Sequence, residues 1–125
     1  GFYHWKAGRR CGLDHAVPRL VERHGTPMTD YEAIQTRLYL PLVNEAVRCL
    51  NDGVARGPAD VDLGLVMGTG FPPFRGGPLR NADLMGLARV VEGLNELATR
   101  HGERLSPEPK LVEMALGGRR FYPEG

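Results

Sequence analysis

One long apolar segment in the first half of the chain constrains the fold more than any other feature. Thr29 and Glu32 form a capping-box pattern, which predicts the start of a helix. We expect this helix to run to about Asp52, with Gly53 as a left-handed stop. At about 100° per residue, its apolar side chains cover well over half of the circumference; they are Ile34, Leu38, Tyr39, Leu40, Leu42, Val43, Ala46, Val47 and Leu50. Such a helix is predicted to lie at the centre of the domain, with neighbours on several sides.

The same helix carries a narrow polar stripe, made of Arg37, Asn44, Arg48 and Asn51. Asn44 lies on this stripe, and we expect its amide to tie down a loop rather than to bind a substrate. Pro41 lies in the middle of the helix and cannot donate a hydrogen bond to the carbonyl of Arg37. We therefore expect a kink at this proline.

Glu45 is the residue of this helix with the strongest case for chemistry. A carboxyl group set against Ile34 and Leu38, at the margin of the apolar face, could keep its proton and act as an acid or a base. The alternative is that Glu45 pairs with Arg48 one turn on, or holds a loop amide. We favour the alternative, because an unpaired buried carboxylate is costly and structural ion pairs are common at such margins.

Glycine and proline divide the rest of the chain into shorter helices. Asp14 is expected to cap a short helix that ends at Gly25. Further helices are predicted from Gly57-Pro58 to Gly68, from Gly77-Pro78 to Gly86, from there to Gly102, and after Ser106-Pro107-Glu108. No segment alternates apolar and polar residues over any length, so the predicted fold class is all-α. We expect residues 1–13 to be a linker or the tail of a preceding domain, and residues 14–125 to form one helical domain.

The composition excludes several classes of protein. A chain of 125 residues suffices for one domain, and a net charge of +1 gives no electrostatic case for nucleic acid or an anionic membrane surface. No apolar run approaches a bilayer span, and no signal-peptide pattern opens the chain. Cys11 and Cys49 make no disulfide framework, which favours a reducing, cytoplasmic setting. The first residue is Gly1 and not Met, so we expect a fragment of a longer chain.

Neither a metal site nor a phosphate-binding loop is predicted. The candidate zinc ligands do not have the spacing of a compact zinc framework; they are Cys11, His15, His24 and Cys49. The glycines between positions 68 and 77 are interrupted by two prolines and two phenylalanines, and no Lys-Ser/Thr pair follows them. We interpret this segment as a stiff loop in which Phe71 and Phe74 contact the core or a neighbour.

From about Ile34 through Tyr122, the order of landmarks resembles the C-terminal helical domain of the 3-hydroxyacyl-CoA dehydrogenases. The resemblance is closest to the second copy of this domain in the multifunctional fatty-acid oxidation enzymes, which combine an enoyl-CoA hydratase with the dehydrogenase. The matching landmarks are Arg37, Pro41, Asn44-Glu45-Ala46, Arg48-Cys49-Leu50, Asp62, Gly68, Gly70, Phe71-Pro72-Pro73, Gly77-Pro78-Leu79, Asp83, Gly86 and Val90-Val91. The resemblance implies an all-α fold of the 6-phosphogluconate dehydrogenase C-terminal-like type.

The resemblance also implies that this copy is not catalytic. Catalytic members have an asparagine immediately before Arg37 that positions the substrate carbonyl, and here that place holds Thr36, whose hydroxyl cannot replace an amide. The family's catalytic His-Glu pair and its GxGxxG nucleotide fold belong to a preceding domain. The implied parent enzyme uses NAD and acyl-CoA substrates, and this fragment has no catalytic, cofactor-binding or metal residue of its own. The structural candidates are Arg37, Pro41, Asn44, Glu45 and Arg48.

The partners that the resemblance implies are the preceding domains of the same chain and, in some complexes, a thiolase subunit. The isolated fragment is expected either to pair with itself as a homodimer or to leave an apolar surface bare. The Phe-Tyr pair of Gly1-Phe2-Tyr3 recurs at Phe121-Tyr122, as a tandem duplication would leave it. Two alternatives stay open: a free-standing helical interaction module, and a small enzyme whose pocket joins Glu45, Arg37 and a histidine.

Overall fold

The computed structural model describes residues 2–20 and 30–123 of the chain. The helices of the described residues are α1 (Val17–Leu20), α2 (Tyr31–Asn51), α3 (Pro58–Thr69), α4 (Pro78–Met85), α5 (Leu87–His101) and α6 (Pro109–Leu116). Two short 3-10 turns, η1 (Pro73–Arg75) and η2 (Glu103–Leu105), lie in the connections. The predicted all-α class is therefore confirmed for the main body of the domain. None of the described helices is both long and apolar enough to cross a membrane.

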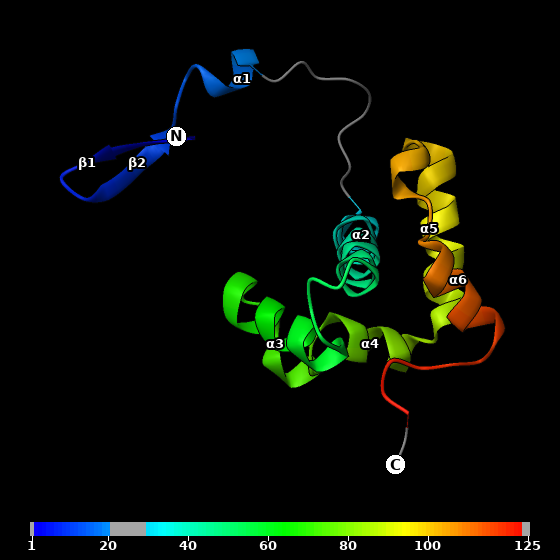
Figure 1. Ribbon diagram of the computed structural model, residues 1–125. Coiled ribbons are helices and arrows are strands. Elements are labelled where there is room, and N and C mark those ends of the chain that lie inside the picture. Colours follow the sequence, from blue (N-terminus) through cyan, green and yellow to red (C-terminus); the bar gives the residue numbers. More distant parts are fainter. Residues whose placement is uncertain (1, 21–29, 124–125) are drawn as a thin grey trace.

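Helix α2 is the central element of the domain, as its wide apolar face predicts. It contacts α3 and α4 on one side and α5 and α6 on the other (Figure 1). Its core residues are Leu40, Val43, Ala46 and Val47, and they meet Val61, Leu79, Ala82, Leu87, Val90, Leu94, Leu97 and Leu111. The apolar face of α2 is not fully buried by these neighbours, because Leu38 has 70% of its surface exposed.

The ends of α2 follow local capping rules. The carboxylate of Asp30 caps the helix by accepting a hydrogen bond from the backbone N–H of Glu32 at 3.0 Å. Thr29, the predicted cap, lies outside the described residues. Gly53 follows the helix with a φ of +68°, which confirms the predicted left-handed stop. The helix continues without interruption through Pro41.

Residues 2–13 contain regular structure. Strands β1 (Tyr3–Lys6) and β2 (Arg9–Leu13) form an antiparallel hairpin, in which Ala7 and Gly8 turn with φ values of +49° and +74°. The expectation of no strand was wrong here, because every side chain of both strands is exposed and the hairpin therefore needs no alternating apolar face. Asp14 accepts a hydrogen bond from the N–H of Ala16 before α1, as predicted, and the predicted end of α1 at Gly25 lies outside the described residues.

Candidate functional site

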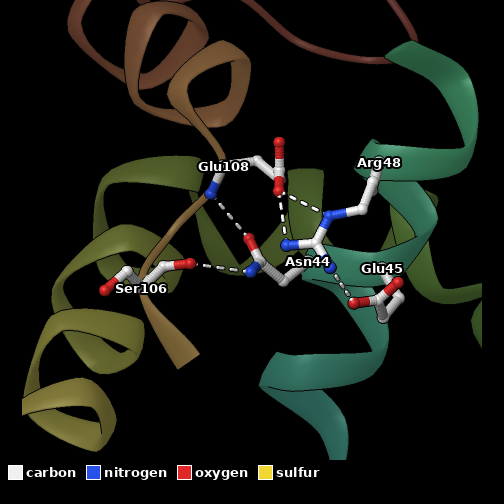
Figure 2. Close-up of polar contacts among 5 residues, drawn as sticks. All are labelled: Asn44, Glu45, Arg48, Ser106 and Glu108. Atoms are coloured by element: carbon white, nitrogen blue, oxygen red, sulfur yellow. Dashed lines mark hydrogen bonds and ion pairs between the residues drawn. The ribbon is translucent and has the colours of Figure 1, made fainter. Parts of the chain in front are cut away.

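Asn44 uses both the nitrogen and the oxygen of its amide to hold the connection between η2 and α6. It is buried on α2, with 3% of its surface exposed. Its Nδ2 donates to the carbonyl of Ser106 at 2.9 Å, and its Oδ1 accepts from the backbone N–H of Glu108 at 2.8 Å (Figure 2). One donor and one acceptor of this buried amide are thus bonded within the domain, and the side chain is directed at its own chain rather than at solvent.

Arg48, one turn further along α2, completes a polar cluster that also contains Asn44 and Glu108. Its Nε and Nη2 lie 2.8 Å and 2.6 Å from the same carboxylate oxygen of Glu108, and this hydrogen bond raises the pKa of the guanidinium (Figure 2). The side chain of Glu108 is only 16% exposed, so it is the more enclosed partner of this pair. Asn44 and Arg48 together attach α6 to α2 through residues some 60 positions apart in the chain.

Glu45 forms the predicted ion pair with Arg48, through Oε1 and Nη1. It is not set into the apolar face, because its side chain is 60% exposed and meets Arg48 at the outer side of the cluster (Figure 2). Near residue 45 the burial of α2 thus differs from the expected pattern: Asn44, expected on the polar stripe, is buried, and Glu45, expected at the apolar margin, is exposed. The basis for acid or base chemistry at Glu45, a carboxyl group surrounded by apolar side chains, is absent from the structure.

The start of α6 differs from the sequence prediction. Ser106 does not cap this helix, since the N-cap residue is Glu108 and its side chain makes no capping bond. Ser106 instead ends η2 and offers its carbonyl to Asn44. The N–H of Glu108, the residue just before α6, is bound from α2 by the Asn44 amide, and no local sequence pattern reveals that contact.

Two buried aspartates, which the sequence analysis did not single out as site residues, organise the other end of the domain. Asp62 of α3 accepts hydrogen bonds from the N–H groups of Leu79 at 2.7 Å and Arg80 at 3.0 Å, so it caps α4 from a different helix. Asp83 of α4 accepts from the N–H groups of Phe121 at 3.0 Å and Tyr122 at 2.9 Å. Asp62 and Asp83 are 3% and 8% exposed. The only signal in the sequence was their agreement with the family landmarks.

Tyr122 links the two aspartates. Its hydroxyl donates to Oδ2 of Asp62 at 2.9 Å, and the guanidinium of Arg80 lies 5.0 Å from the centre of its ring. The pKa of Tyr122 is raised above its ordinary value, most by burial of the phenol and next by its hydrogen bond to Asp62. The C-terminal segment is therefore fixed to both α3 and α4.

The remaining candidates line surface hollows rather than one pocket. A groove of about 650 Å³ has Thr36, Tyr39, Phe71 and Arg75 among its lining residues. Tyr39 donates to the carbonyl of Pro78 at 2.9 Å and lies against Phe71, with ring centres 6.2 Å apart. Phe71 thus contacts the domain as expected, whereas Phe74 is 87% exposed.

Arg37 does not meet Glu45. Arg37 and His101 line one hollow of about 250 Å³, and Glu45 lines a different one beside Cys49. The pocket that a small self-contained enzyme would need, joining Glu45, Arg37 and a histidine, is not assembled among the described residues. No group of three or more His, Cys, Asp or Glu side chains in that part of the chain could hold a metal ion. Cys11 and Cys49 are free thiols, and His24 lies outside the described residues.

Comparison with known proteins identifies the family. Residues 34–121, which include α2 through α6 apart from the first turn of α2, match the model of the 3-hydroxyacyl-CoA dehydrogenase C-terminal domain. The chain belongs to this family. The match begins inside α2 and ends at Phe121, so this dehydrogenase C-terminal domain contains the Asn44 cluster and both buried aspartates, while the hairpin lies outside the match.

Longer relatives cover nearly the whole chain. It is 43% identical over 122 residues to the fatty acid oxidation complex subunit alpha of Vibrio vulnificus, strain CMCP6, and 44% identical over 125 residues to that of Shewanella loihica. Both alignments cover 98% of this chain and 17% of the relative. The chain therefore spans about a sixth of the length of the curated relatives it matches.

Proposed function

We propose that this chain is a structural, non-catalytic copy of the dehydrogenase C-terminal domain within a fatty-acid oxidation α subunit. The parent chain would hydrate enoyl-CoA and oxidise 3-hydroxyacyl-CoA with NAD, in a reducing cytoplasmic setting and together with a thiolase subunit. The domain itself would hold no cofactor. Its contribution would be to pack against the preceding domains of the same chain.

The observation that carries this proposal is the direction of the polar side chains on α2. Asn44 spends both ends of its amide on the η2–α6 connection, and Arg48 is occupied by Glu108 and Glu45. A catalytic residue needs an atom that a substrate can reach, and these side chains bind parts of their own domain. They support a role in holding helices together.

Thr36 also supports the proposal, because it is a side chain that a substrate could reach but that lacks the chemistry the reaction needs. It lines the groove beside Tyr39 and Phe71, where a substrate could reach a side chain. Catalytic members of the family have an asparagine amide at this place, which both donates and accepts hydrogen bonds. A threonine hydroxyl is shorter and cannot orient a carbonyl in the same way, so the groove lacks the group that the reaction would use.

The proposal is tested by NAD binding and turnover with the purified chain. Isothermal calorimetry should detect no NAD binding, and no absorbance at 340 nm should develop with NAD and a 3-hydroxyacyl-CoA. Saturable NAD binding, or NADH formation above a no-protein control, would overturn the proposal. The full-length α subunit provides the positive control for both measurements.

A free-standing helical interaction module remains the second candidate, because large apolar side chains such as Leu38, Phe74 and Leu116 are exposed. The two candidates differ in the open reading frame. A start codon next to the codon for Gly1 would favour the module, and continuous coding sequence for a nucleotide-binding domain upstream would favour the α subunit.

A further inference from the structure

We propose that the outer side of α3, with the hollow beside it, is the surface through which this domain packs against another domain of its parent α subunit, and that it receives an uncharged, apolar helix there. We call the outer side of α3 the α3 face; it consists of Leu63, Gly64, Met67 and Gly68. The inference rests on the proposed function, because it names the surface and the partner that a structural copy would use.

Helix α3 carries apolar side chains on both its inner and its outer side. It lies at one edge of the domain, against α2 and α4 (Figure 1). Val61 is buried in the core, whereas Leu63 and Met67 are 64% and 79% exposed. Helices that are apolar all round are normally buried, so we infer that the exposed side of α3 is covered in the parent subunit.

The chemistry of the α3 face specifies an apolar partner. Residues 63–69 carry no charged side chain. Their one polar side chain, that of Thr69, donates from Oγ1 to the carbonyl of Leu65 at 2.7 Å, within its own helix. A charged group brought against this face would lose water and gain no counter-charge, which is costly. The element that covers the α3 face is therefore apolar.

A hollow of about 410 Å³ between α2 and α3 continues this surface, and Gly64 is one of its lining residues. Most of the other lining residues are apolar; they include Leu42, Ala46, Val54, Val61 and Leu65. The charged residues that line it are each held in an ion pair; they are Glu45 with Arg48, and Arg56 with Asp60. The hollow can therefore take an apolar side chain from the partner.

Two glycines one turn apart, Gly64 and Gly68, indicate that the partner comes close to the backbone of α3. Beyond the local helix backbone, no atom of the described residues lies within 4 Å of the place that a Cβ would take at either position. Gly93 in α5 is different, because a Cβ there would lie 2.5 Å from Cδ1 of Leu40, so this glycine lets α2 approach. A glycine inside a helix is less favourable than alanine, and the distance between packed helices depends on the side chains at the contact. We infer that Gly64 and Gly68 make room for a helix from outside the domain.

The partner helix belongs to the same polypeptide in this proposal. The relatives from Vibrio vulnificus and Shewanella loihica cover 98% of this chain, and the matched part is 17% of each relative, so most of such a subunit lies outside the matched residues. A helix on the same polypeptide is held near the α3 face at a high effective concentration, whereas a second copy must associate from solution.

Cys49 provides a test that changes no residue, because it is a free, half-buried thiol that lines the hollow. The 125-residue chain and the full-length α subunit that contains it are each treated with iodoacetamide, and modification of Cys49 is followed by mass spectrometry of its peptide. We expect Cys49 to react roughly tenfold or more slowly in the α subunit, where the hollow is covered.

Two outcomes of the labelling experiment would overturn the proposal. Equal rates in the α subunit and the 125-residue chain would show that nothing covers the hollow. A rate in the 125-residue chain that falls as the protein concentration rises would show that a second copy covers it, and the partner would then not be another domain of the same chain.

Gly64→Ala should have opposite effects in the two proteins. In the 125-residue chain it should raise the melting temperature by about 4 °C, because alanine favours the helix and the space beside Gly64 is open. In the α subunit it should make Cys49 react faster, because the added methyl group keeps the partner helix away. Gly93→Ala is the matched control and should lower the melting temperature of the 125-residue chain, since its Cβ meets Leu40.

A lower melting temperature for Gly64→Ala in the 125-residue chain would mean that the domain itself needs this glycine, and it would contradict the proposal. An unchanged rate at Cys49 in the Gly64→Ala α subunit would contradict it as well. Neither measurement involves NAD. The proposed function fails if the chain binds NAD, whereas this inference fails if the α subunit does not protect Cys49.

Discussion

Asn44 and Asp62 each connect segments that are distant in the sequence, and each does so with one short polar side chain. Asn44 joins α2 to the residues before α6, and Asp62 joins α3 to the start of α4 and to the C-terminal segment. Both are about 3% exposed, so a loss of one partner leaves a polar group without water to replace it. At the scale of single residues, these buried side chains define how the loops join the helices.

Replacing Asn44 by alanine should destabilise the domain by roughly 1–3 kcal/mol, since the carbonyl of Ser106 and the N–H of Glu108 both lose their partner. The fall in melting temperature should be about 4 °C per kcal/mol for a domain of this size. Glu45→Ala is the matched control on the same helix and should melt near the wild type, because Glu45 is exposed and Arg48 keeps Glu108. Equal losses from the two variants, measured by calorimetry, would contradict this ranking.

Alkaline pH should weaken the fold through two half-buried phenols, those of Tyr39 and Tyr122. Burial raises the pKa of Tyr39 from 10.0 to about 12, and the pKa of Tyr122 is raised as well. Below pH 10 both phenols are protonated in the folded and unfolded states, and their contribution to stability is complete. Between pH 10 and about 12 only the unfolded state loses these protons readily, so stability must fall as the pH rises.

Urea unfolding at a series of pH values measures this effect. The unfolding midpoint should decline above pH 10, and Tyr39→Phe should make the decline shallower because the variant has one half-buried phenol fewer. A variant that declines as steeply as the wild type would show that Tyr39 does not contribute.

Helix ends, and not helix interiors, account for most of the differences between the sequence predictions and the structure. The helices from α2 onward were predicted by their periodicity and by glycine and proline stops. The start of α6 was not predicted correctly, because Asn44 binds it from another helix and a capping pattern contains only local information. The hairpin was missed because its exposed side chains follow no apolar alternation.

In the candidate site, too, local contacts could be predicted from the sequence and long-range contacts could not. The pairing of Glu45 with Arg48 follows from their spacing of one turn. The more enclosed partner, Glu108, lies 60 residues further along the chain, and no spacing rule reaches that far. The expected kink at Pro41 and the expected domain start at residue 14 stay predictions.

The contact between α3 and α4 depends on Gly77, which precedes α4 with a φ of +110°. A Cβ atom there would lie 2.3 Å from Cβ and Cγ of Asp62, which is an impossible approach. Gly77→Ala should therefore break the cap of α4 in addition to straining the backbone.

Gly86→Ala is the matched control, since Gly86 has a φ of +88° but no atom lies within 4 Å of the place that a Cβ would take. It should cost about 1–2 kcal/mol through backbone strain alone. Chemical denaturation should find Gly77→Ala clearly less stable than Gly86→Ala. Equal stabilities would mean that the Asp62 contact adds nothing beyond the strain.

At the scale of the whole molecule, the domain leaves many large apolar side chains uncovered. Tyr31 and Leu38 on α2 are 73% and 70% exposed, and Phe74 and Leu116 are 87% and 86% exposed. Exposed apolar area of this kind commonly marks a surface that meets another protein or domain. It agrees with the proposal that this domain packs against other parts of a longer chain.

The isolated chain should therefore self-associate. Light scattering over a concentration series is expected to show a mass that rises towards a dimer, and Leu38→Ser should lower that mass because it removes an exposed apolar side chain of α2. Glu45→Gln, on the same helix, serves as the control for a polar change. A chain that stays a monomer at all concentrations, without binding an apolar dye, would exclude the prediction.

The most direct measurement is made on the full-length α subunit that contains this domain, with Asn44→Ala introduced into it. Melting temperature and NAD-dependent oxidation of a 3-hydroxyacyl-CoA are determined on the same preparation, and turnover is expressed per folded molecule. A structural role for the Asn44 cluster predicts a lower melting temperature with unchanged turnover. An unchanged melting temperature with lost turnover would contradict it and would place Asn44 in the chemistry of the enzyme.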